Sequence, residues 1–245
     1  MIKVKSLSKE FIGSSGKKEV FKDINLDIDK YKIYGIIGPS GAGKSTILNI
    51  VAGLVKPDSG QVLINEIDIT SLNSKDLRQY QKDIGVVFQD YNLLSNLTVL
   101  DNVALPLKLS KIDKGVRENE ARKVLAYVGL ENEVKSYPSE LSGGMKQRVA
   151  IARAIIKKPK ILLLDEVTSA LDQETANIII RLLKRINKEL GITILIVSHD
   201  ILTIRKLCTN VSVLKDGKIV DFLELEDIND DSDFNYKQEL GVLYD

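Results

Sequence analysis

The sequence predicts an α/β fold built on a mostly parallel sheet with helices on both of its faces. Two observations indicate this fold: short, nearly continuous runs of Ile, Val and Leu, and helical patterns between those runs. Strands of a parallel sheet are covered on both sides, so they are apolar at almost every position. Strands that alternate with helices are typical of an α/β domain. The four apolar runs are IYGIIG (33–38), IGVVFQ (84–89), ILLLDE (161–166) and ITILIVSH (192–199).

The N-terminal segment has a different pattern. The runs IKVKSLSKEF (2–11) and VFKDINLDI (20–28) alternate apolar with polar residues, as half-exposed antiparallel strands do. We therefore expect an antiparallel N-terminal β subdomain beside the parallel sheet.

Two of the segments between the apolar runs have the spacing of amphipathic helices. In EARKVLAYVGL (120–130) the apolar residues share one face, and Gly129 is placed to end the helix. From Ala176 to Leu190 the apolar positions again recur on one face, and Gly191 follows as the stop. Both helices lie between predicted strands, as the α/β fold requires.

The C-terminal part predicts a hairpin followed by an acidic tail. The run VSVLKDGKIVDF should turn at Asp216-Gly217. From Asp221 to Asp233 there are seven carboxylates and no Lys or Arg. We interpret this stretch as solvated and assign 231–245 as a short acidic tail.

Composition and charge exclude some classes of protein. The chain of 245 residues carries 35 basic and 34 acidic side chains, so a formal charge of +1 gives no bulk attraction for nucleic acid. The single cysteine, Cys208, lies in an apolar run and is expected to be a core thiol in a reducing compartment. We find no signal-peptide pattern and no apolar run of the roughly 18–20 residues that a membrane span needs. We expect a cytosolic protein that serves any membrane through a partner.

Polar groups follow all four predicted core strands. They are the glycine loop that starts at Gly38, Gln89, the pair Asp165-Glu166, and His199, the only histidine of the chain. The carboxyl ends of parallel strands meet at one edge of the sheet, which is where α/β proteins bind ligands. The sequence therefore predicts one site at that edge.

The loop from Gly38 to Ser45, GPSGAGKS, fits the P-loop pattern of nucleotide-binding proteins, with a strand before it and a helix after it. Its backbone N–H groups would face phosphates, Lys44 would reach the β- and γ-phosphates, and the Ser45 hydroxyl would ligate Mg²⁺. In ILLLDE, Asp165 would hold that ion and Glu166 would polarise the attacking water. A P-loop NTPase core follows from these features.

A second glycine motif, ELSGGMKQR (140–148), also resembles a phosphate cradle at the start of a helix. Two other nucleotide-binding classes do not fit the chain. The nearest match to the guanine-reading motif of GTPases ends in Leu190 instead of an aspartate, and a Rossmann site needs a different glycine spacing.

Taken together, the P-loop, Gln89, LSGGM, ILLLDE, SALD (169–172) and His199 resemble the ATPase subunit of ABC transporters along nearly the whole chain. The resemblance implies an ATPase domain over 1–230, with a helical lobe at about 91–157. It also implies that two copies pair head to tail, so that the LSGG motif of one copy closes over ATP held by the P-loop of the other.

The resemblance implies roles for individual residues. Phe11 would stack on adenine, Gln89 would couple the site to a membrane partner, and His199 would touch the γ-phosphate. The residues expected to be catalytic are Lys44, Glu166 and His199, and those expected to hold Mg²⁺ are Ser45, Gln89 and Asp165. The residues expected to contact ATP are Phe11, Gly38, Pro39, Ser40, Gly41, Ala42, Gly43, Lys44, Ser45, Thr46, Gln89, Ser142, Gly143 and Gly144.

Within the family the chain most resembles methionine-importer ATPases, through stretches such as YNLLSNLTVLDNVALPL and DEVTSALDQET. This likeness implies permease subunits, a solute-binding protein, an amino-acid substrate and a peripheral place at the cytoplasmic face of the cell membrane. We expect the chain to depart from that group by lacking its C-terminal sensing domain. It also has Met145 where the signature usually has glutamine, and Tyr31 where a turn glycine is usual.

Three alternatives remain. GPSGAGKSTILNIVAGL also resembles the ATPases of lipoprotein-release and macrolide export, which usually have GNLD where this chain has SALD. A soluble cassette ATPase acting on nucleic acid or ribosomes is disfavoured by the neutral charge, and no nucleic-acid partner is expected. A nucleotide-binding protein without turnover is disfavoured by Glu166.

Overall fold

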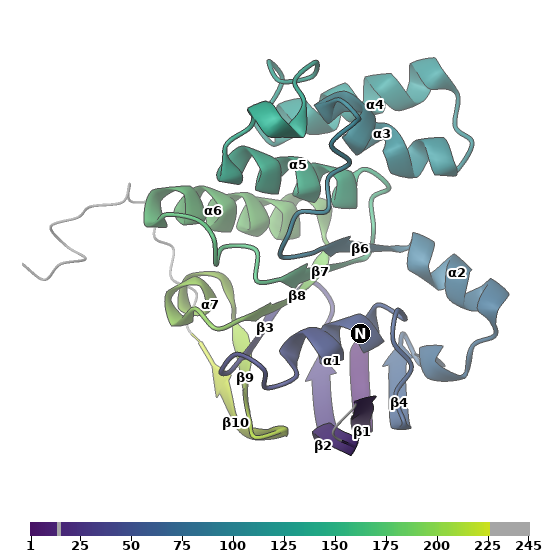
Figure 1. Ribbon diagram of the computed structural model, residues 1–245, viewed down its shortest axis with the longest axis vertical. Helices are drawn as coiled ribbons and strands as arrows, with labels where there is room; N and C mark the ends of the chain where they lie inside the picture. The colour runs from purple at the N-terminus through teal and green to yellow at the C-terminus, as the bar shows by residue number, and fades with distance from the viewer. Residues whose placement is uncertain (14–15, 226–245) are drawn as a thin grey trace, which may run out of the picture.

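The computed structural model describes residues 1–13 and 16–225, and a six-stranded sheet forms its centre (Figure 1). The strand order is β10-β9-β3-β8-β7-β6; all neighbours are parallel except the terminal pair β10 and β9. The strands are β3 (Ile33–Ile37), β6 (Ile84–Val87), β7 (Ile161–Asp165), β8 (Thr193–Ser198), β9 (Asn210–Lys215) and β10 (Lys218–Glu224). The four predicted core strands are confirmed, and they are consecutive neighbours in the sheet.

Helices and a second sheet cover the two faces of this central sheet. In β7, Leu162 and Leu164 pack into the cluster formed with the helices, whereas Ile161 and Leu163 pack toward α1 (Lys44–Val51) and the second sheet. Both sets are fully buried. The continuous apolar runs of the sequence therefore result from two alternating sets of core residues on one strand.

The second sheet is antiparallel, with the order β2-β1-β4-β5. Its strands are β1 (Ile2–Gly13), β2 (Gly16–Ile28), β4 (Ser59–Ile64) and β5 (Ile67–Asp68). The alternating pattern of the N-terminal segment is confirmed, because Ile2 and Val4 of β1 are buried while Lys5 is exposed. The subdomain is not purely N-terminal, since β4 and β5 come after α1 in the chain.

The remaining helices of the central part are α2 (Ser74–Lys82), α6 (Gln173–Leu190) and α7 (Ile201–Leu207), with a short 3₁₀ helix at Ile69–Ser71. Gly191 ends α6 with a φ of 62°, as its sequence predicts. Leu190 departs from the predicted apolar face, because 46% of its surface is exposed. Leu190 is the last residue of α6, next to the Gly191 that ends the helix.

A helical part lies between β6 and β7, in the upper half of Figure 1. It contains α3 (Val99–Leu109), α4 (Lys114–Tyr127), a 3₁₀ turn at Pro138–Glu140 and α5 (Gly143–Ile155). Apolar residues of these helices and of β7 belong to one continuous cluster. The helical part therefore shares its core with the sheet, and the boundaries 91–157 and 1–230 stay predictions.

The C-terminal hairpin is confirmed. Asp216 and Gly217 have φ values of 49° and 70° between the antiparallel strands β9 and β10. Strand β10 reaches Glu224, so the first carboxylates of the acidic stretch belong to a strand. The predicted tail, 231–245, lies outside the described residues. Cys208 is buried as expected, and burial raises the pKa of its thiol.

Among the described residues, the search for a helix with the length and apolar character of a membrane span finds none.

Candidate active site

The glycine loop connects β3 to α1, and its first glycine lies close to the backbone of β9. A Cβ atom built on Gly38 would lie 2.1 Å from the carbonyl oxygen of Leu214, so only glycine fits there. Gly43 precedes α1 with a φ of 99°, a conformation that side chains disfavour, and no side chain caps the helix. The first N–H groups of α1 have no partner within the helix. Such a helix start suits an anion.

Lys44 is the first residue of α1 and is 4% exposed. Its ammonium donates to the carbonyl oxygens of Gly38 at 2.9 Å and Pro39 at 3.0 Å. It also lies 3.7 Å from Oε1 of Glu166. The loop therefore curls around a buried positive charge.

Ser45 and Asp165 meet beside this lysine. The Ser45 hydroxyl donates to Oδ1 of Asp165 at 2.8 Å, across 120 residues of sequence. Burial raises the pKa of the Asp165 carboxyl and the charge of Glu166 adds to that effect, whereas the Ser45 hydrogen bond and Lys44 oppose it. An added cation would favour the ionised form of this carboxylate.

Glu166 makes a sharp turn at the end of β7. Its φ of 49° is unusual for a residue with a side chain, and its N–H donates to the Val197 carbonyl of β8 at 2.9 Å. The carboxylate Oε1 lies 3.1 Å from Nδ1 of His199. The strained backbone thus sets the carboxylate between Lys44 and His199.

The sheet order explains this assembly. Strand β8 lies between β3 and β7, so the glycine loop, His199 and the acidic pair emerge from three adjacent strands. The structure brings together Lys44, Ser45, Asp165, Glu166 and His199, five residues that the sequence predicts for the site.

Gln89 and Phe11 take no part in the hydrogen bonds just described. Gln89 is exposed, two residues beyond the end of β6, the strand next to β7. Phe11 lies in β1, 47% exposed, with the Lys9 ammonium 5.2 Å above its ring. Their contacts with a nucleotide and with Mg²⁺ stay predictions.

The LSGGM motif lies at the start of α5, which packs against α3, α4, α6 and β6 in the upper part of the molecule (Figure 1). Ser142 is exposed, and its hydroxyl oxygen accepts the Met145 N–H at 3.3 Å. A Cβ atom on Gly144 would lie 2.2 Å from Cγ2 of Thr175 in α6. Met145 itself packs against the main core cluster. Methionine in place of the usual glutamine therefore leaves the cap of α5 intact.

Sequence reasoning missed one group of residues near the site. Arg153 of α5 donates to the carbonyl oxygens of Tyr91 and Asn92, just beyond Gln89. An arginine within the apolar helical run VAIARAI is a sequence feature that could have marked it.

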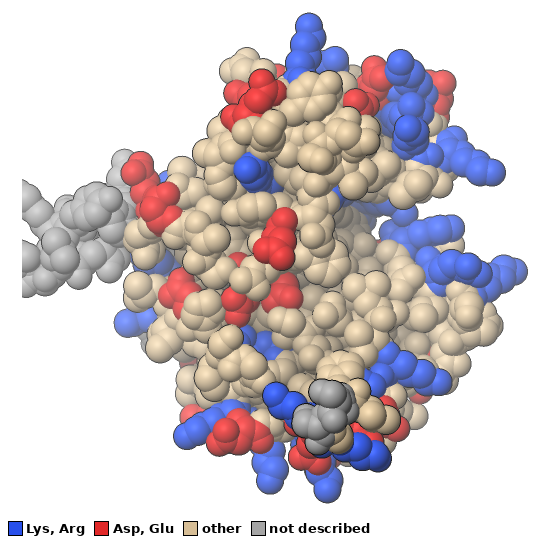
Figure 2. All heavy atoms as spheres, in the orientation of Figure 1, with Lys and Arg blue, Asp and Glu red and all other residues tan. Residues whose placement is uncertain are grey.

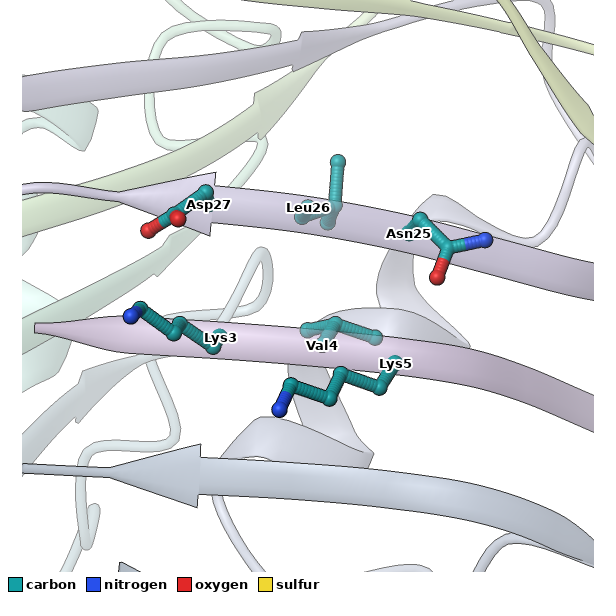
Figure 3. Close-up of a pocket in the computed structure, with 6 residues that line it drawn as sticks. All are labelled: Lys3, Val4, Lys5, Asn25, Leu26 and Asp27. Atoms are coloured by element: carbon teal, nitrogen blue, oxygen red, sulfur yellow. The ribbon is translucent and has the colours of Figure 1, made fainter. Parts of the chain in front are cut away.

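The structure also has an open hollow on the face of β1 and β2, lined by residues of neighbouring strands (Figure 3). These are Lys3, Val4, Lys5, Asn25, Leu26 and Asp27. None of them belongs to the predicted site. The register pairs Lys3 with Asp27 and Val4 with Leu26, which makes the hollow a feature of strand pairing.

Comparison with known families decides the classification. Residues 21–169 match the ABC transporter family. This chain belongs to that family. Among curated relatives, the chain is 47% identical over 221 residues to the methionine import ATP-binding protein MetN 4 of Oceanobacillus iheyensis, covering 90% of this chain and 64% of the relative.

A second curated relative is the methionine import ATP-binding protein MetN 2 of Enterococcus faecalis. The identity is 46% over 228 residues, which cover 93% of this ABC chain and 66% of the relative. The chain therefore spans just under two thirds of the length of both relatives.

Solved structures show the same fold. The dimeric bacterial ABC transporter cassette MJ0796 has a TM-score of 0.85 and 39% identity, covering 92% of this chain and 99% of that chain. A dimeric post-hydrolysis state of the same ATP-binding cassette, bound to ADP and Pi, has the same scores and coverage. The predicted P-loop NTPase architecture is confirmed.

Proposed function

We propose that this ABC family member binds ATP with Mg²⁺, hydrolyses the ATP and thereby powers a transporter, working as a homodimer. The observation that carries the proposal is the cluster of Lys44, Ser45, Asp165, Glu166 and His199 at one edge of the sheet. The nucleotide-bound state of MJ0796 supports ATP as the ligand, and its dimeric structures support pairing of two copies.

The residues present fit a magnesium ion. Ser45 and Asp165 supply a hydroxyl and a carboxylate 2.8 Å apart, and oxygen is the ligand that Mg²⁺ prefers. Within the described residues, no group of three or more His, Cys, Asp or Glu side chains could form a metal cage. Magnesium ions at nucleotide sites commonly use only one or two protein carboxylates together with substrate phosphates and water. The bound ion would supply charge neutralisation for the phosphates.

Each residue of the cluster has a role in this proposal. The backbone N–H groups of the glycine loop and Lys44 hold the phosphates. Glu166 accepts the proton of the attacking water, and His199 holds the Glu166 carboxylate in place through Nδ1. The strained turn at Glu166 keeps the base in position before substrate binds.

The second glycine motif completes the site of the other copy. Ser142, Gly143 and Gly144 lie at the start of α5, in the helical part, whereas Lys44 begins α1 on the opposite side of the central sheet. In a head-to-tail pair, this helix start would face the phosphates bound by the partner's glycine loop. ATP then becomes part of the interface, so binding favours closure and loss of the γ-phosphate favours opening.

The test uses Glu166→Gln, which removes the base and retains the shape of the side chain. With ATP and Mg²⁺, this variant should form particles of twice the 27.2 kDa of the chain, and its ATP turnover should fall at least about 100-fold. Adding Ser142→Arg should retain ATP binding and abolish pairing. The proposal is wrong if Glu166→Gln protein remains monomeric while ATP is demonstrably bound, or if it turns over ATP at the parental rate.

We further propose that the transported substrate is methionine or another amino acid, taken up through permease subunits that receive it from a solute-binding protein, while this chain is bound to the permease at the cytoplasmic face of the membrane. The MetN relatives support this substrate class. The test is to co-purify the membrane partner, reconstitute the complex in vesicles and measure methionine-dependent ATP turnover and the direction of transport. Outward movement of a lipid-anchored or macrolide substrate would favour the export alternative.

The nucleic-acid alternative predicts a different measurement. On the face shown in Figure 2, basic side chains are prominent along the right-hand and lower margins, but acidic side chains lie among them and in the middle, so the two signs of charge are mixed on this face. We therefore expect no salt-sensitive affinity of the pure protein for DNA or RNA. Such an affinity, with a steep dependence on salt, would support the alternative.

A further inference from the structure

The segment that follows Gln89 has an unusual backbone. Tyr91 and Asn92 have φ values of 60° and 48°, so two successive residues with side chains are in the left-handed region. Each such residue costs about 1–2 kcal/mol relative to ordinary backbone, somewhat less for asparagine. Strain of this kind persists where neighbouring groups hold the backbone in place.

Helix α5 holds this backbone through Arg153 and lies beside the Tyr91 side chain near its other end. Near its C-terminal end, Arg153 donates through Nη1 to the Asn92 carbonyl at 2.6 Å and through Nη2 to the Tyr91 carbonyl at 2.7 Å. Near its N-terminal end, a Cβ atom on Gly143 would lie 3.4 Å from the Tyr91 hydroxyl. Tyr91 therefore spans α5 from its final turns to the residue that follows Ser142.

The position of Arg153 on the helix suits this bridge. Arg153 follows Ser142 by eleven residues, about three helical turns, so both lie on the same side of α5. Arg153 is half-buried, and burial lowers the pKa of its guanidinium. A charged group removed from water needs strong acceptors, and the two carbonyl groups supply them.

Helix α3 fixes the other end of the same segment. Asn102 is completely buried and accepts the Leu94 N–H at 2.8 Å. Its amide donates to the carbonyl oxygens of Leu94, Leu97 and Thr98 at 3.0–3.1 Å. The chain from Tyr91 to Thr98 is thus attached to the helical part. Gln89 lies between this attached segment and β6.

We infer that Tyr91 and Arg153 form a positioning unit that couples the location of Gln89 to that of the LSGGM motif at the start of α5, which we call the LSGGM corner. A displacement of the backbone at Gln89 moves the Tyr91 ring and the two carbonyl groups bound by the Arg153 guanidinium. Helix α5 moves with them, and Ser142 moves with α5. This inference rests on the proposed function, in which Ser142 completes the site of the partner copy, and on the prediction from the sequence that Gln89 belongs to the nucleotide site of its own copy. Neither Tyr91 nor Arg153 needs to touch the nucleotide.

The first test is Arg153→Lys in the Glu166→Gln protein. Lysine keeps the charge but lacks the planar fork that holds two carbonyl groups together. We expect the ATP affinity of the dilute monomer to change less than twofold and ATP-driven dimerisation to weaken at least tenfold. A general loss of folding stability would not weaken dimerisation while leaving the ATP affinity of the monomer unchanged.

Arg148 provides a matched control on the same helix. It is also partly buried, and its Nη1 donates to the Val128 carbonyl at 3.1 Å and to the Gly129 carbonyl at 2.9 Å. Those carbonyl groups lie just beyond the end of α4 and differ from the Tyr91 and Asn92 carbonyl groups that Arg153 binds. Arg148→Lys should therefore leave ATP-driven dimerisation within twofold of the parent, at a similar change in thermal stability.

Hydrogen exchange supplies a readout that does not depend on dimerisation. Arg153→Lys should speed exchange in 88–97 and also in 141–146, whereas Arg148→Lys should act on 126–132. Tyr91→Gly, which fits the left-handed backbone without strain but removes the ring, should speed exchange in 141–146 as well. These measurements need no nucleotide.

The outcomes separate the two proposals. The coupling is refuted if Arg153→Lys and Tyr91→Gly both dimerise within twofold of the parent, or if Arg148→Lys matches their loss. If the Glu166→Gln parent itself binds ATP without pairing, the proposed function fails, and exchange alone decides the coupling. Faster exchange in 141–146 then supports the unit, and a change confined to 88–97 overturns it.

Discussion

Gly144 offers a direct test of how the LSGGM corner is built. A Cβ atom there would lie 2.2 Å from Cγ2 of Thr175, far inside any van der Waals contact. Thr175 cannot rotate away without loss, because its hydroxyl donates to Oδ2 of Asp172 at 2.7 Å and its N–H to Oδ1 at 2.9 Å. Gly144→Ala should therefore force α5 and α6 apart or break this cap.

The expected magnitude follows from three terms. Overpacking costs about 1–3 kcal/mol, and loss of the threonine hydrogen bond adds about 1 kcal/mol. Alanine returns up to about 1 kcal/mol, because it is the better helix former. We expect a net loss of about 2 kcal/mol, which lowers Tm by about 4–8 °C for a chain of this size.

Thr175→Ser is the compensating change, because it removes Cγ2 and keeps the capping hydroxyl. Alone it should cost about 0.8 kcal/mol for one buried carbon. Combined with Gly144→Ala it should remove the clash, so the double-mutant cycle should give a coupling energy of about 2 kcal/mol in favour of the pair. Gly143→Ala is the neighbouring control, since its Cβ would meet other side chains at an ordinary 3.4 Å.

The assay is thermal and urea unfolding of these proteins without nucleotide. Equal stability of Gly144→Ala and the parent would refute the packing role of Gly144. So would additive effects of Gly144→Ala and Thr175→Ser, because the clash involves only their two side chains.

Two further predictions concern strain and charge. Tyr31 has a φ of 65° and is 65% exposed, so Tyr31→Gly should stabilise the protein by about 1 kcal/mol, whereas Tyr31→Ala should not; equal Tm values for the two variants would contradict this. The folded pKa of Asp165 is raised above its ordinary 3.8, so the stability that its protonated form contributes at low pH is lost as the pH rises through that folded pKa. Asp165→Asn should therefore gain stability relative to the parent as the pH rises above 3.8 and through the folded pKa, in urea unfolding without Mg²⁺, and a pH-independent difference would contradict the shift.

The parts of the fold that the sequence predicts are those with dense local patterns. The core strands are buried on both faces, and the terminal hairpin has an Asp-Gly turn. Helix α2 has no fully buried residue and therefore no apolar stripe to detect. It is held by the Asn73 cap and by the Tyr80 hydroxyl, which donates to the Val51 carbonyl at 2.6 Å. Strand β4 has only Val62 and Ile64 buried, too few for a clear period.

The candidate site also has parts that the sequence predicts and contacts that it does not. The glycine loop and the acidic pair are local motifs, and the strand-end rule places them together. The contact of His199 with Glu166 spans 33 residues, and the Arg153 bonds span 61 and 62. No periodicity or spacing encodes such pairs, because the first depends on the pairing of β7 with β8 and the Arg153 bonds depend on how α5 packs against β6. An arginine in an apolar helix indicates that a partner exists but not which one.

The two glycine motifs of this chain differ in what their glycines do, and the difference supports the proposal that one nucleotide site uses both. Gly38 and Gly43 permit close backbone approach and a left-handed turn around the Lys44 charge. Gly144 permits close packing of α5 on α6, which leaves Ser142 exposed at the helix start. The Ser142 oxygen accepts one N–H, so its own hydrogen can still be donated outward. A helix start with donors directed away from its own helical part suits an anion bound by another molecule. The Glu166→Gln experiment tests this arrangement.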